Sequence, residues 1–132
     1  MFGRFDMMRH ERVQASVYRW FFDTASTLCN ITLDMDSTVI TRHGERQGAA
    51  RGYNPSKRGR LSHHPLLAFV AEARMVANFW SRPGDASSAN NALQFIESTL
   101  HHVGSKTVGL LRADSGFFDQ AVFKLLEGKR IG

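Results

Sequence analysis

Cysteine, long apolar segments and signal-like features are all scarce in this chain of 132 residues. The single cysteine, Cys29, excludes an intrachain disulfide and a cysteine metal cluster, so a reducing, cytoplasmic compartment is the default expectation. No apolar run approaches the ~20 residues that cross a bilayer, and Met1–Arg4 leads into a charged stretch instead of a signal peptide. With 42% hydrophobic and 22% charged residues, the composition predicts one ordinary globular domain with its own core.

Acidic residues are also scarce, and they are fewest between Arg42 and His64. This stretch holds six Lys or Arg, three His and one acid, Glu45. Five Gly or Pro residues interrupt it, which predicts an extended loop. A basic loop attracts phosphates, particularly in a chain of net charge +5. A solvated surface loop without a ligand is an equally weighted alternative.

What the sequence does contain is two short acidic segments, each at the end of an apolar run. Ile31–Ile40 carries Asp34 and Asp36, and Val108–Phe118 carries Asp114. Side chains alternate across a strand, so Asp34 and Asp36 should share one face. Carboxylates on strands with buried character are costly unless they are paired or hold a metal. The pattern predicts a divalent-cation site and phosphoryl-transfer chemistry on a polyanion.

The hydrophobic periodicity predicts a succession of helices and strands along the chain. Residues 31–41 and 107–113 are expected to be strands that lie parallel and are joined by a right-handed crossover. Asp85, Ser87 and Ser88 are candidate N-caps for the crossover helix, and Gly128 is expected to close the last helix. The predicted helices cover residues 5–28, 87–102 and 118–128.

The segment His64–Trp80 is ambiguous on propensity alone. Its Ala, Leu, Met, Glu and Arg content and its apolar stripe favour a helix. The competing interpretation is a β-hairpin that turns at Glu72 to Arg74, with strands near 66–71 and 75–82.

Four segments in order along the chain resemble a bacterial insertion-sequence transposase of the DDE group, named for its Asp-Asp-Glu catalytic residues. They are Leu33–Val39, Gly52–Arg60, His63–Val70 and Leu110–Phe117. The resemblance implies an α/β, ribonuclease-H-like mixed sheet, in which three antiparallel strands are followed by a helix and a parallel strand. It therefore selects the hairpin for residues 66–82. It also implies two regions: 1–29 as the helical tail of an N-terminal region and 30–132 as a partial catalytic domain.

The resemblance also assigns roles to individual residues. Asp36 matches the first catalytic aspartate and Asp114 the second, and both would bind Mg²⁺ or Mn²⁺. Asp34 is expected to support that metal site from behind the direct ligands, with a structural ion pair as the alternative. Arg112 shares the face of Asp114, where it would hold a phosphate or a carboxylate, or else pair with Asp34 or Asp36. The residues expected to contact DNA are Arg42, Arg46, Arg51, Lys57, Arg58, Arg60 and Arg112.

The partners implied are double-stranded DNA at transposon ends and at the target, with no membrane, in the bacterial cytoplasm and nucleoid. The intact enzyme could act as a dimer on DNA. The third catalytic residue of the group, a glutamate, lies well beyond the second aspartate, whereas Glu127 is only 13 residues past Asp114. We therefore expect a fragment that is inactive alone. The alternatives are a non-catalytic basic nucleic-acid-binding module and a ribonuclease-H-like nuclease outside transposition.

Overall fold

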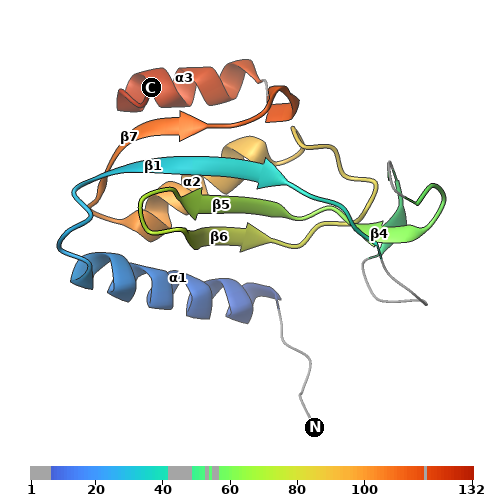
Figure 1. The fold of residues 1–132 in the computed structure, drawn as a ribbon, viewed down its shortest axis with the longest axis horizontal. Helices are drawn as coiled ribbons and strands as arrows, with labels where there is room; N and C mark the ends of the chain where they lie inside the picture. The colour runs from blue at the N-terminus through green and yellow to red at the C-terminus, as the bar shows by residue number, and fades with distance from the viewer. Residues whose placement is uncertain (1–6, 42–48, 53, 55–56, 118) are drawn as a thin grey trace, which may run out of the picture.

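The computed structural model describes residues 7–41, 49–52, 54, 57–117 and 119–132 (Figure 1). The helices in this part of the chain are α1 (Met7–Thr24), α2 (Ala92–Val103) and α3 (Gln120–Lys129), with a 3-10 turn, η1, at Ser115–Phe117. None of these helices is long and apolar enough to cross a membrane. The strands are β1 (Asn30–Ser37), β2 (Ile40–Thr41), β3 (Ala50–Arg51), β4 (Leu61–His63), β5 (Leu66–Val70), β6 (Met75–Trp80) and β7 (Thr107–Arg112).

The main sheet has four strands in the order β6-β5-β1-β7. β5 is antiparallel to both β1 and β6, whereas β7 is parallel to β1. The chain reaches β7 from β6 through α2, which lies behind the sheet in Figure 1. This mixed sheet of three antiparallel strands and a later parallel one is the ribonuclease-H-like arrangement that the resemblance implied. The fold prediction is therefore confirmed.

The hairpin β5–β6 confirms the choice made against helical propensity. Leu66 pairs with Trp80 and Val70 with Met75 across it, and Arg74 in its turn has a positive φ of 53°. Ala68 lies in the core, fully buried. Burial of β5, which lies between β1 and β6 in the sheet, outweighs the modest helical preference of the hairpin residues. Helix propensity contributes only tenths of a kcal/mol per residue.

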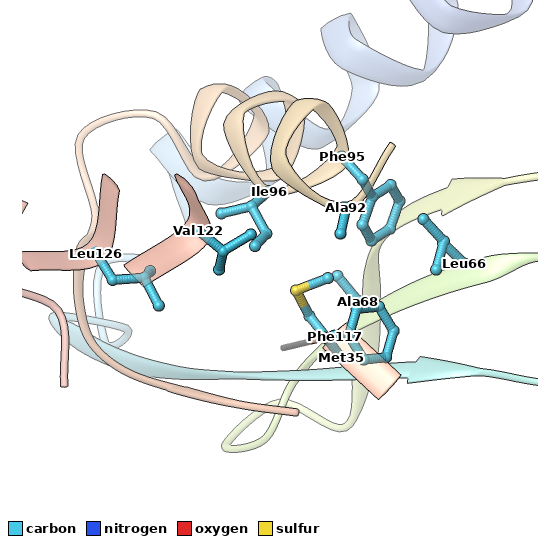
Figure 2. Close-up of a cluster of buried hydrophobic side chains, with 9 residues drawn as sticks. All are labelled: Met35, Leu66, Ala68, Ala92, Phe95, Ile96, Phe117, Val122 and Leu126. Atoms are coloured by element: carbon cyan, nitrogen blue, oxygen red, sulfur yellow. The ribbon is translucent and has the colours of Figure 1, made fainter. Parts of the chain in front are cut away.

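One part of the core lies between the sheet, α2 and α3 (Figure 2). Along β1, Ile31, Leu33 and Met35 are buried, so the intervening Asp34 and Asp36 face the opposite side of the sheet. Trp80 packs against this core, edge-to-face with Phe95 at a ring separation of 5.4 Å. The cluster drawn in Figure 2 comprises Met35, Leu66, Ala68, Ala92, Phe95, Ile96, Phe117, Val122 and Leu126.

A second part of the core joins α1 to the other end of the sheet. Phe22 of α1 is fully buried and packs with Ile31, Leu33 and Val103. The C-terminal half of α1 therefore shares a core with the strands that follow it. The boundary between regions 1–29 and 30–132 stays a prediction.

β7 contains a β-bulge where it pairs with β1. Ile31 pairs with Val108 but Thr32 pairs with Leu110, which leaves Gly109 as the extra residue. A Cβ atom at Gly109 would lie 2.5 Å from Oδ1 of Asn30. A side chain at Gly109 would therefore have to displace the exposed side chain of Asn30.

Two sequence-based predictions about the connections are wrong. The basic stretch is not only a loop, because β2, β4 and β3 form a second, three-stranded sheet. Gly84 lies against this sheet so closely that a Cβ atom there would be 2.2 Å from Ser62 Oγ. The last helix is not closed at Gly128, since α3 continues to Lys129 and Arg130 adopts the left-handed conformation, donating its N–H to Glu127 O.

The crossover helix also begins later than predicted, at Ala92 instead of near residue 87. The reason is the buried Arg82 side chain, whose Nη1 donates to the carbonyl oxygens of Ser87 at 2.8 Å and Asn90 at 2.7 Å. These bonds favour successive turns over residues 87–91 in place of a helical start. Asn91 takes the N-cap position in a left-handed conformation without a side-chain capping bond.

Candidate active site

The pairing of β1 with β7 brings the two acidic segments together. After the bulge, every paired residue on β7 is numbered 78 above its partner, and the last pair is Asp34 with Arg112. β7 ends at Arg112, so Asp36 and Asp114 each lie two residues beyond the last pair, and extending the register would bring them level with each other. Neighbouring strands lie about 4.8 Å apart. The register therefore supports the predicted approach of the two carboxylates.

Both carboxylates are exposed and are held by backbone N–H groups. Oδ1 of Asp36 accepts a hydrogen bond from the N–H of Ser37 at 2.7 Å. Oδ1 of Asp114 accepts one from the N–H of Gly116 at 2.8 Å, which fixes the turn that opens η1. The buried Phe117 anchors that turn in the core. In the described part of the chain, neither carboxylate forms an ion pair.

Asp34 and Arg112 form a two-pronged ion pair across the same strands. Arg112 Nε donates to Asp34 Oδ1 at 2.6 Å and Nη2 donates to Oδ2 at 2.8 Å. The hydrogen bonds from the guanidinium lower the pKa of Asp34 and raise the pKa of Arg112. Among the alternatives for these residues, the structural ion pair is the one found, and it occupies both carboxylate oxygens of Asp34. Phosphate binding by Arg112 would have to use the donors that remain.

The carboxylate of Glu72 has a structural role beside β1. Both oxygens of Glu72, in the β5–β6 turn, lie 3.0 Å from the N–H of Thr32. This hydrogen bond lowers the pKa of Glu72. Glu72 thus accepts the hydrogen bond of the Thr32 N–H beside the β-bulge. Nothing in the sequence around Glu72 indicated this role.

The basic residues predicted to contact DNA lie on or beside the second sheet. Arg51 on β3 is exposed, as are Lys57, Arg58 and Arg60 before β4. β4 lies beyond the end of β1 that carries Asp36 (Figure 1). The exposed cations are therefore on the side of the molecule toward which the acidic end of β1 points. Arg42 and Arg46 lie outside the described residues.

Comparison with known proteins places this geometry in a family. The family model for Transposase DDE domain group 1 matches residues 3–132, which is nearly the whole chain. The chain belongs to the DDE transposase family. No curated protein matches it.

Two solved structures of Mos1 transposase match this DDE-family chain. The Mos1 transposase paired-end complex with left transposon end superimposes with a TM-score of 0.50 and 12% sequence identity, covering 97% of this chain and 42% of that one. A pre-cleavage Mos1 transpososome gives a TM-score of 0.46 at 12% identity, covering 95% of this chain and 41% of the other. The chain thus spans about two fifths of the Mos1 chains. The similarity to the paired-end complex supports a fold shared with Mos1 transposase.

Within the described residues, no three His, Cys, Asp or Glu side chains gather into a complete metal site. The two aspartates assigned from the resemblance nevertheless suit a hard divalent cation, because Mg²⁺ commonly uses one or two protein carboxylates and retains water ligands. Carboxylate oxygens are the ligands that such an ion requires. The assignment of Asp36 and Asp114 as catalytic carboxylates of this DDE-family chain stays a prediction.

Proposed function

We propose that Asp36 and Asp114 are the first two catalytic carboxylates of a DDE transposase. The intact enzyme would hydrolyse a phosphodiester at each transposon end and join the freed 3′-OH to target DNA. The observation that supports this proposal is the β1–β7 register, because Asp36 and Asp114 each follow by two residues its last pair, Asp34 with Arg112, at one end of the sheet. Membership of the DDE transposase family supports it.

Within this chain, Asp36 and Asp114 would hold the metal through their carboxylate groups, and the backbone N–H groups bonded to Oδ1 of each would fix their orientation. A bound Mg²⁺ or Mn²⁺ would activate the attacking oxygen and stabilise the leaving oxygen. The ion pair with Arg112 would keep Asp34 ionised next to this site without competing for the metal. The third carboxylate would come from a glutamate further along than residue 132.

The DNA backbone would be bound by the exposed cations of the second sheet and the residues before β4, with Arg42 and Arg46 in the same basic stretch. The substrate would be double-stranded DNA, at the transposon end and at the target, and the enzyme would work inside the cell, where that DNA is. An insertion sequence is the mobile element we expect to encode it, and Mg²⁺ the cofactor in the cell.

The experiment that tests the metal site is a thermal melt of the full chain with and without Mn²⁺. With two protein ligands we expect a Kd of about 1 mM, so about 10 mM Mn²⁺ stabilises the folded state by about 1.4 kcal/mol. That corresponds to a rise in melting temperature of about 5 °C for a domain of this size. Asp36→Asn and Asp114→Asn should each abolish the rise.

Asp85→Asn is the matched control, because Asp85 is an exposed aspartate in the loop after β6. Its melting response to Mn²⁺ should equal that of the parent protein. If Asp114→Asn keeps the full response, the metal lies elsewhere and the proposal fails. DNA binding that weakens with salt but ignores both asparagine variants and Mn²⁺ would instead favour a non-catalytic basic module.

A further inference from the structure

Ser88 connects the two acidic segments although it belongs to neither. Its Oγ lies 2.8 Å from Oγ of Ser37, the residue that follows Asp36 on β1. Ser37 in turn donates its backbone N–H to Oδ1 of Asp36. A hydrogen bond between hydroxyls 51 residues apart in sequence therefore attaches the loop between β6 and α2 to the end of β1.

The same serine packs against the turn that carries Asp114. A Cβ atom built on Gly116 would lie 3.1 Å from Cβ and 3.2 Å from Oγ of Ser88, and 2.9 Å from Oδ1 of Asp114. The absence of a side chain at Gly116 thus lets the turn approach Ser88 closely. Ser88, half-buried, fills the space between the ends of β1 and β7.

The loop around Ser88 is itself fixed from inside the protein. Arg82 is only 5% exposed, and its guanidinium donates to the carbonyl oxygens of Ser87 and Asn90 on either side of Ser88. Nε of Arg82 also donates to His64 O at 3.0 Å, beside the start of β5. The position of Ser88 is therefore determined by buried hydrogen bonds that do not depend on a ligand.

We propose that Ser88 is a positioning residue of the metal site, which sets the separation of Asp36 and Asp114 through its hydrogen bond to Ser37 and its contact with Gly116. This inference rests on the proposed function. Its physical basis is that a cation bound by two carboxylates on separate strands is sensitive to their spacing. Groups that orient metal ligands typically change metal affinity 10–100-fold when removed.

The test compares Mn²⁺ affinity, measured by electron paramagnetic resonance of free Mn²⁺, in the parent chain and in Ser88→Ala. We expect the Kd to rise about tenfold, while the melting temperature without metal changes little. Ser87→Ala is the matched control, because Ser87 is the neighbouring exposed serine and contributes its carbonyl group to Arg82. Its Mn²⁺ affinity should equal that of the parent.

A second variant, Ser37→Ala, shows whether Ser88 affects the metal site through its hydrogen bond to Ser37. It should weaken Mn²⁺ binding, and adding Ser88→Ala to it should weaken binding by less than the product of the two single effects. An unchanged Kd in Ser88→Ala, with binding still abolished by Asp114→Asn, would overturn this inference and leave the metal site standing. Absence of Mn²⁺ binding to the parent chain would overturn the metal site and this inference with it.

Discussion

Replacing Arg82 by methionine should destabilise the protein strongly. Methionine keeps most of the apolar stem but removes the guanidinium, which donates to the carbonyl oxygens of His64, Ser87 and Asn90 at 3.0, 2.8 and 2.7 Å. Hydrogen bonds from a charged donor contribute roughly 1.5–3 kcal/mol each. Loss of the buried charge offsets part of that sum, because burying it costs solvation energy. Burial also lowers the pKa of Arg82, in keeping with that cost.

The balance is a loss of about 3 kcal/mol in the free energy of unfolding. This loss is well below the sum of the three hydrogen bonds, in part because Nη2 of Arg82 is buried and has no hydrogen-bond partner among the described residues. For a domain of this size we expect a fall of about 10 °C in melting temperature. Arg82→Lys should recover only part of the loss, since one ammonium cannot reproduce the fork that reaches all three carbonyls.

The assay is urea unfolding followed by circular dichroism, with the melting temperature as a second measurement. Arg58→Met provides the control, because Arg58 is an exposed arginine outside this network. It should unfold at the same urea concentration as the parent. If Arg82→Met unfolds within about 1 kcal/mol of the parent protein, the three carbonyl contacts do not hold the loop and the reasoning is wrong.

Two further predictions concern other parts of the molecule. Because the Arg112 hydrogen bonds lower the pKa of Asp34 below its ordinary value of 3.8, this pair stabilises the fold above about pH 4 and loses its effect as the pH falls through the lowered pKa. The difference in urea midpoint between the parent and Asp34→Asn should therefore shrink between about pH 5 and pH 2, and a difference independent of pH would contradict this. Gly84→Ala should lower the melting temperature, because its Cβ would lie 2.2 Å from Ser62 Oγ and 2.6 Å from Ala50 O. An unchanged melting curve would show that the second sheet moves freely.

The strands were predictable because burial imposes a pattern on their residues. Alternation along β1 indicated which side chains face the core, and it set Asp34 and Asp36 together on the other face. The hairpin at 66–80 was not predictable from periodicity, since a buried edge hairpin and an amphipathic helix can both use the same apolar residues. Resemblance to a family supplied that choice, and the pairing of β5 with β6 confirms it.

The errors arise where distant residues determine local structure. The late start of α2 depends on Arg82, whose carbonyl partners lie five and eight residues further along and whose burial cannot be read from its neighbours. Likewise, Ser88 has the sequence signal of an N-cap, yet its hydroxyl bonds to Ser37 across the fold. The choice between phosphate binding and ion pairing for Arg112 required the β1–β7 register. Sequence alone leaves that register undetermined.

The bulge at Gly109 absorbs one extra residue of β7 before the strand reaches the candidate site. Before it, partners on β7 are numbered 77 above those on β1, and after it they are numbered 78 above. If the bulge closed while Gly109 stayed in the chain, the offset would remain at 77, Ala113 would come level with Asp36, and the alternation of side chains would turn Asp114 to the opposite face. Deleting Gly109 would remove the bulge and keep the pairs from Thr32 with Leu110 to Asp34 with Arg112, so the segment that leads to Asp114 would keep its register. The bulge thus separates the length of this segment from its register, so a chain with one residue fewer between Thr107 and Asp114 would still present that aspartate in the same register.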